Sequence, residues 1–217
     1  MRDDQLVIHE IYASIQGESS FAGRPCAFVR TTGCNLRCSW CDTPQAFHGG
    51  TRMAREDVLA QALAYGTPLV EITGGEPLLQ AGVLPLMAAL CDADKIVLIE
   101  TSGERDISAI DARVHRIVDL KAPGSGESDR VRWENLACLG KRDEVKIVLR
   151  DRADYEWAKE VLSRHGLCQK AGEVLLSPVH AVLDPRTLVQ WVLDDRLAVR
   201  VNLQLHKYVW GQHTQGV

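Results

Sequence analysis

Short runs rich in Val, Ile and Leu alternate with amphipathic stretches along most of the chain. From Pro25 onward, seven such runs are typical of strands, and four stretches between them carry apolar residues at helical spacing. This alternation predicts an α/β fold in which a parallel sheet is wound with helices. The earlier run 6–12 is expected as an additional edge strand. The expected strands are 26–31, 68–73, 95–100, 116–121, 144–149, 173–177 and 199–205, and the expected helices are 56–65, 82–90, 154–165 and 184–193.

Polar and glycine-rich segments follow nearly every expected strand. In parallel α/β folds the loops at the carboxyl ends of the strands carry the chemistry, because they vary without disturbing the packed sheet. We therefore expect several strands to direct side chains into one pocket. The segments are the cysteine-containing loop after residue 31, TGGEP at 73–77, ETSG at 100–103, LKAPGSG at 120–126, SPVH at 177–180 and LHK at 205–207.

Length and composition are those of an ordinary globular chain. Its 217 residues, 46% of them hydrophobic, are enough for one domain, 1–217, in which 24–50 holds the cysteine loop and 198–217 the last strand and tail. A net charge of −4 does not favour nucleic acid or an anionic membrane as a partner. With no apolar run long enough to span a bilayer and no signal-like start, we expect a cytoplasmic protein.

Three of the seven cysteines, Cys34, Cys38 and Cys41, form a C-x3-C-x2-C pattern. Structural zinc needs a fourth ligand, for which His48 or Cys26 is available. A redox pair at Cys38 and Cys41 leaves Cys34 without a role. The pattern favours a 4Fe-4S cluster whose fourth iron is open to another ligand.

The cysteine pattern resembles that of the radical S-adenosylmethionine (SAM) superfamily, with an aromatic residue, Trp40, before the last cysteine and a GGEP loop at 74–77. The resemblance implies that SAM chelates the open iron and that an electron from the cluster cleaves it to a 5'-deoxyadenosyl radical. The two glycines are expected to adopt positive φ and to let the backbone approach SAM. The SAM-binding residues expected on this basis are Trp40, Asp42, Gly74, Gly75, Glu76, Glu100, Ser102, Lys121 and Ser177.

Within that superfamily the chain resembles the 7-carboxy-7-deazaguanine synthase family. The resemblance rests on YASIQGES, FVRTTGCNLRCSWCDT, ITGGEP, IETSG, DLKAPGSG and QLHKYVWG. It implies a partial (β/α) barrel of radical SAM type, a homodimer and an external one-electron reductant such as flavodoxin. It also implies a carbon–nitrogen lyase of queuosine and 7-deazapurine biosynthesis. That enzyme contracts the ring of 6-carboxy-5,6,7,8-tetrahydropterin to 7-carboxy-7-deazaguanine with loss of ammonia, assisted by magnesium, and SAM is recycled.

The resemblance also assigns the substrate side of the pocket. Thr43 is the implied magnesium ligand, which suits an ion that prefers hard oxygen atoms. The guanidinium of Arg30 suits the substrate carboxylate, and His206, expected with Lys207 at the end of the last strand, lies near the same group. The implied substrate-binding residues are Ile15, Gln16, Gly17, Glu18, Arg30, Thr73 and His206.

Two other functions compete with this one. A glycyl-radical-enzyme activase would share the cysteine loop but consume SAM stoichiometrically. A non-catalytic zinc-binding module would leave the TGGEP and ETSG loops without a purpose. The chain also departs from the family pattern in two places: Ser19 and Ser20 stand where glycine often follows IQGE, and the tail 211–217 varies in length within the family.

Overall fold

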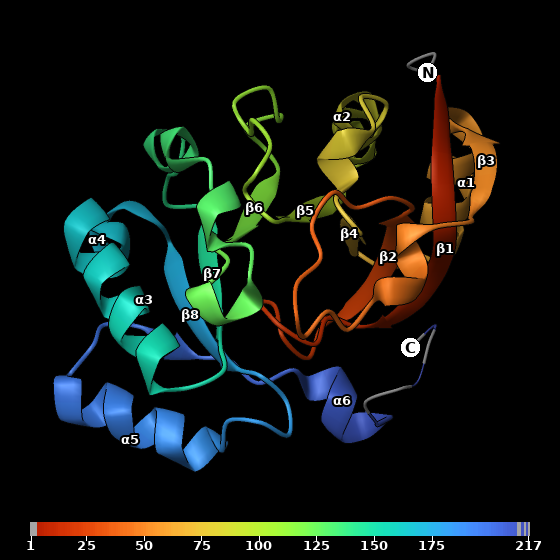
Figure 1. The fold of residues 1–217 in the computed structure, drawn as a ribbon. Coiled ribbons are helices and arrows are strands. Elements are labelled where there is room, and N and C mark those ends of the chain that lie inside the picture. The colour runs from red at the N-terminus through yellow and green to blue at the C-terminus, as the bar shows by residue number, and fades with distance from the viewer. Residues whose placement is uncertain (1–3, 212–213, 215, 217) are drawn as a thin grey trace.

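The backbone is organised around one nine-stranded sheet in the order β3-β1-β2-β4-β5-β6-β7-β8-β9 (Figure 1). The computed structural model describes residues 4–211, 214 and 216. Neighbouring strands from β2 to β9 are parallel, whereas β1 runs antiparallel to both β2 and β3. The strands are β1 (Gln5–Ile15), β2 (Pro25–Thr31), β3 (Thr51–Ala54), β4 (Leu69–Gly74), β5 (Ile96–Thr101), β6 (His115–Asp119), β7 (Glu144–Leu149), β8 (Glu173–Pro178) and β9 (Arg200–Val201).

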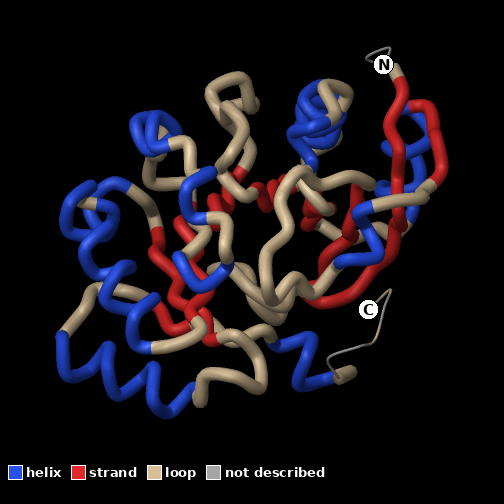
Figure 2. Tube along the Cα trace, in the orientation of Figure 1, coloured by secondary structure: helices blue, strands red, loops and turns tan. Residues whose placement is uncertain are grey.

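The sheet does not close on itself, because β3 and β9 form its two ends. The result is a partial barrel, as the sequence predicted. Most helices lie along its outer side, and loops gather at its centre (Figure 2). The helices are α1 (Arg55–Ala64), α2 (Val83–Asp92), α3 (Arg152–His165), α4 (Leu167–Lys170), α5 (Pro185–Asp195) and α6 (Leu205–Val209).

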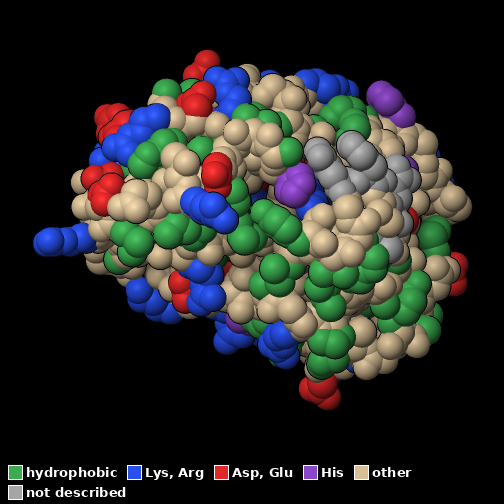
Figure 3. All heavy atoms as spheres, turned by 90° about the horizontal axis from the view of Figure 1, so that it is seen from below, with side chains coloured by type: hydrophobic (Ala, Val, Ile, Leu, Met, Phe, Trp, Pro, Cys, Tyr) green, Lys and Arg blue, Asp and Glu red, His purple; other side chains and the backbone are tan. Residues whose placement is uncertain are grey.

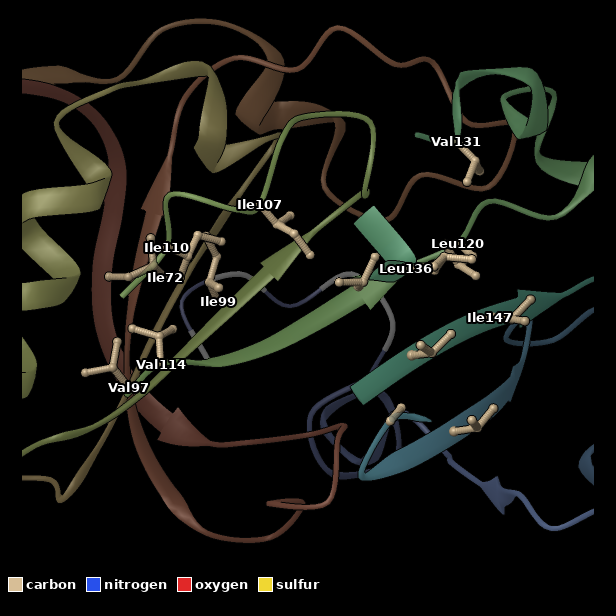
Figure 4. Close-up of a cluster of buried hydrophobic side chains, with 14 of the residues drawn as sticks. Ile72, Val97, Ile99, Ile107, Ile110, Val114, Leu120, Val131, Leu136 and Ile147 are labelled. Atoms are coloured by element: carbon tan, nitrogen blue, oxygen red, sulfur yellow. The ribbon is translucent and has the colours of Figure 1, made fainter. Parts of the chain in front are cut away.

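The two faces of the parallel strands carry different side chains. On the outer face, Val70 and Ile72 of β4 join Val97 and Ile99 of β5 in the large core against the helices (Figure 4). On the inner face, a smaller apolar cluster closes the amino-terminal end of the barrel, while polar side chains follow toward the carboxyl ends. The inner cluster consists of Cys26, Phe28, Leu69, Leu98 and Ile117. The alternation therefore seals one end of the barrel and leaves the other end for a site.

Two expectations about the C-terminal region were wrong. The strand expected at 199–205 is only two residues long in β9, and His206 and Lys207 lie in helix α6 instead of ending a strand. The backbone leaves the sheet after Val201, and the N–H of Leu205 donates to the carbonyl oxygen of Gly17 at 2.8 Å. A loop–helix contact thus replaces further strand pairing. The short β3 and α4 were also not anticipated. Positions 212, 213, 215 and 217 of the tail lie outside the described residues.

Candidate active site

The cysteine loop lies across the carboxyl ends of the strands and is held from two sides. On one side the N–H of Glu76 donates to the Gly33 carbonyl oxygen at 2.8 Å. On the other side Ser39 donates from its N–H to the Ser125 carbonyl and from its hydroxyl to the Gly124 carbonyl, both at 2.9 Å. A pocket lies inside the barrel, lined by residues of β1, β2, β4, β5, β6 and β7 and of the loops that follow the strands. All three cysteines of the pattern line this pocket. Segments that are distant in sequence therefore hold the loop in place.

The GGEP glycines are explained by packing and not by backbone conformation. Neither Gly74 nor Gly75 has a positive φ, contrary to expectation. A Cβ at Gly75 would lie 2.7 Å from the Cβ of Cys34 and would also overlap the Gly33 carbonyl oxygen. The loop must therefore lack a side chain here for the cysteine loop to approach it.

Ligation of iron by these cysteines requires loss of the thiol protons. Burial raises the pKa of Cys34, and it raises the pKa of Cys38 to about 11. These groups are therefore protonated at neutral pH in the chain without metal, and thiolate ligation displaces the protons. The three thiols at one rim fit a cluster with one open iron. Of the two residues considered as a fourth zinc ligand, Cys26 is fully buried in the inner apolar cluster and His48 is exposed, and neither lines the pocket.

Most residues expected to bind SAM line the pocket, but two do not. Glu76 is fully buried: its carboxylate accepts hydrogen bonds from the Thr101 hydroxyl at 2.8 Å and from the N–H and hydroxyl of Ser102 at 2.8 and 2.7 Å. Its side chain thus ties the GGEP loop to the end of β5. Ser177 is also fully buried and is not among the pocket residues. The pocket residues among those expected are Trp40, Asp42, Gly74, Gly75, Glu100, Ser102 and Lys121.

Arg30 enters the pocket from β2 as expected, with its side chain 13% exposed. Its Nε donates to Glu10 at 2.7 Å and its Nη2 donates to the Tyr12 hydroxyl at 2.9 Å. These partners on β1 fix the orientation of the guanidinium. Burial alone would lower the pKa of Arg30, but Tyr12 and Glu10 raise it, so the group stays charged.

The IQGE loop and helix α6 lie side by side and both line the pocket. Gly17 lies against the His206 imidazole so closely that a Cβ there would overlap the ring. Burial lowers the pKa of His206, although Glu18 and Asp42 oppose this, so the imidazole is neutral at physiological pH. Ser19, which stands where the family often has glycine, adopts φ 58°, a left-handed conformation that favours glycine.

The environment of Thr43 can accept a cation. Ligand atoms of Glu18, Asp42 and His206 lie within 4.8 Å of one another, and all three residues line the pocket with Thr43. The Asp42 carboxylate forms an ion pair with Lys207 at 3.1 Å. Burial would raise its pKa, but Lys207 and Lys146 lower it to about 2. Carboxylate oxygen ligands fit magnesium, and Thr43 lines the same pocket.

Sequence analysis missed several charged residues on the inner face. Lys146 of β7 contacts both Glu18 and Glu100, and Asp119 of β6 accepts from Lys121 at 2.8 Å. Glu71 of β4 is 2% exposed and accepts from the Gln16 amide at 2.5 Å. All of these residues line the pocket. The sequence feature that could have identified them is a charged residue within an otherwise apolar parallel strand, such as Glu71 in VEIT and Lys146 in EVKIVL.

The chain is similar to known proteins over nearly its whole length. The Radical SAM superfamily model matches residues 28–123. A 7-carboxy-7-deazaguanine synthase of Koribacter versatilis is 49% identical over 98% of this chain and 100% of the relative. The same enzyme of Chlorobaculum tepidum is 47% identical over 98% of this chain and 97% of the relative. The crystal structure of QueE from Escherichia coli aligns with a TM-score of 0.76 and 26% identity, covering 93% of this chain and 95% of that one. The chain belongs to the 7-carboxy-7-deazaguanine synthase family of radical SAM enzymes.

Proposed function

We propose that the protein converts 6-carboxy-5,6,7,8-tetrahydropterin to 7-carboxy-7-deazaguanine, with loss of ammonia and recycling of SAM. The observation that carries the proposal is that one pocket combines three cysteine thiols with an anchored arginine and buried carboxylates. The near-full-length relatives that bear the synthase name support the same reaction. When bound, the cluster and SAM supply radical hydrogen abstraction, and magnesium supplies a cation for the substrate.

The chain's own residues bind and orient the reactants. Cys34, Cys38 and Cys41 hold the cluster, and the backbone at Gly74 and Gly75 lines the SAM side of the pocket. Arg30 binds the substrate carboxylate, because its partners on β1 orient a guanidinium that stays charged in the pocket. Glu18 accepts hydrogen bonds from the aminopyrimidinone edge. Thr43 is the proposed magnesium ligand, next to the Asp42 carboxylate.

Two residues expected to contact SAM, Glu76 and Ser177, have no direct contact in this proposal. The Glu76 carboxylate accepts hydrogen bonds from Thr101 and Ser102 and so positions the GGEP loop without contacting SAM. Ser177 contributes no direct contact in the present conformation, because it is outside the pocket.

The test is an anaerobic assay of the reconstituted protein with SAM, reductant, magnesium and the carboxytetrahydropterin. We expect 7-carboxy-7-deazaguanine by mass spectrometry. Cys38→Ala should abolish cluster binding and turnover, whereas the matched variant Cys168→Ala, which lies in α4 outside the pocket, should retain both. A cluster-loaded protein that consumes SAM and leaves the pterin unchanged would instead favour an activase. A colourless protein holding zinc would favour the non-catalytic module.

We further infer a homodimer, an external one-electron reductant such as flavodoxin, and a cytoplasmic location. Exposed apolar side chains gather on the face around α5 and α6, which supports self-association (Figure 3). Among the described residues, no helix is long and apolar enough to cross a membrane. Light scattering of the purified protein tests the dimer directly. The exposed side chains are Val182, Val189, Leu193, Tyr208, Val209 and Trp210.

A further inference from the structure

Lys146 is a buried cation in the middle of the parallel strand β7. Its neighbours Val145 and Ile147 point into the outer core, so Lys146 points into the barrel, with its side chain 4% exposed. Removing an ammonium group from water is strongly unfavourable unless it is paired and hydrogen bonded. A lysine at this position therefore needs partners in the pocket.

Its partners come from three distant segments. Lys146 Nζ donates to Glu18 Oε2 of the IQGE loop at 2.6 Å and to Glu100 Oε1 of β5 at a still closer approach. Asp119 Oδ2 of β6 is 3.6 Å away and is already paired with Lys121 at 2.8 Å. Lys146 thus acts mainly on Glu18 and Glu100.

The positive charge of Lys146 is stabilised by the carboxylates around it. Burial would lower the pKa of Lys146, but Glu100, Glu18 and Asp119 together raise it well above its usual value. The surrounding carboxylates repel one another, and Glu71 adds a further acid to the same pocket. Without a cation between them, Glu18 and Glu100 would separate or share protons.

The contacts also determine which carboxylate atoms remain for a ligand. Glu18 Oε1 accepts from the Gln204 amide at 2.8 Å, which fixes the carboxylate plane. Among the residues that the structure describes, Glu100 Oε2 accepts no hydrogen bond, and the Glu100 side chain is 23% exposed in the pocket. One oxygen of Glu100 is therefore held by Lys146 while the other faces the cavity.

We propose that Lys146 is a positioning residue for the pterin: its ammonium draws Glu18 and Glu100 together and turns their carboxylates toward the N–H donors of the bound substrate. This inference rests on the proposed function. It predicts a loss of substrate binding with the cluster retained, because the Lys146 contacts join the IQGE loop to β5 and do not involve the cysteine loop.

The test compares Lys146→Met, Glu100→Gln and the double variant, with Lys159→Met as the matched control at a partly exposed, ion-paired lysine of α3. Iron content, the affinity for SAM and the affinity for the carboxytetrahydropterin without reductant are measured on reconstituted protein. Lys146→Met should weaken pterin binding at least tenfold, with iron content unchanged. The double variant should bind the pterin as tightly as the single variant with the lower pterin affinity, because both changes break the contact between Lys146 and Glu100.

Two results would overturn the proposal: pterin affinity within twofold of wild type in cluster-loaded Lys146→Met, or losses that multiply in the double variant. If Lys146→Met fails to fold, the double variant, which also removes a carboxylate charge, carries the same test. A double variant that folds and binds the pterin like wild type would then refute the positioning role. Failure of the wild-type protein to bind or convert the pterin would count against the proposed function instead.

Discussion

Replacing Glu71 with glutamine should stabilise the protein increasingly as the pH rises. Glu71 is 2% exposed on the inner face of β4 and accepts a hydrogen bond from the Gln16 amide at 2.5 Å. Burial, followed by repulsion from Glu100, raises the pKa of Glu71 to about 8 from an ordinary 4.5. Glutamine keeps an oxygen for the Gln16 amide and removes the group that must ionise.

The sign of the effect follows from proton linkage. Because the folded-state pKa lies above the unfolded-state pKa, the folded protein retains a proton between pH 4.5 and 8 that the unfolded chain has released. Wild-type stability therefore falls as the pH rises through this window. From pH 5 to pH 8 the loss attributable to Glu71 is at most about 3.5 kcal/mol, since each pKa unit corresponds to about 1.36 kcal/mol. Glu71→Gln removes this loss.

The assay is urea unfolding of the anaerobic, cluster-free protein, followed by tryptophan fluorescence between pH 5 and pH 8. The difference in unfolding free energy between Glu71→Gln and wild type should grow with pH. Glu160→Gln is the control, because its carboxylate is 62% exposed on α3 and should give a nearly constant difference. A difference for Glu71→Gln that is the same at pH 5 and pH 8 would refute the reasoning.

Three further substitutions test other parts of the account. Arg30→Ala should keep the cluster and SAM cleavage but weaken pterin binding by about 2 to 5 kcal/mol, as for loss of a desolvated charge pair; unchanged affinity by titration would exclude the carboxylate role. Gly75→Ala should reduce iron content after reconstitution, because its Cβ would collide with the cysteine loop, while Gly140→Ala, whose added Cβ would lie 3.8 Å from the nearest atom, should load normally. Arg196→Gly should stabilise the protein by about 0.5 to 1 kcal/mol, because this exposed residue at the end of α5 has φ 50°; a lower melting temperature would contradict that explanation.

The sequence was sufficient for the longer strands and for helices α1, α2, α3 and α5, because their signal is local. The alternating faces of β4 and β7 and the amphipathic α3 depend on side chains within one element. The C-terminal region was different. The run 199–205 has strand-like residues, but only Arg200 and Val201 pair with β8, because the chain then turns to meet Gly17. That contact joins residues nearly 190 positions apart, and no local pattern reports it.

Parts of the site could be predicted where the residue types allow few kinds of chemistry. The spacing of the three cysteines indicated a cluster, and the segments after the strands indicated the rim. The pairing of charges was not predictable, because Lys146 and Glu18 are 128 residues apart. Glu76 shows the converse: its position in a known motif suggested a ligand contact, yet its side chain holds two loops together.

The most direct test of the central claim is the ratio of product to consumed SAM over many turnovers. The reconstituted protein is supplied anaerobically with a limiting amount of SAM, excess 6-carboxy-5,6,7,8-tetrahydropterin, magnesium and reductant. Product and 5'-deoxyadenosine are then quantified by mass spectrometry. We predict many equivalents of 7-carboxy-7-deazaguanine for each SAM, with little 5'-deoxyadenosine. Stoichiometric 5'-deoxyadenosine with unchanged pterin would contradict the proposed function.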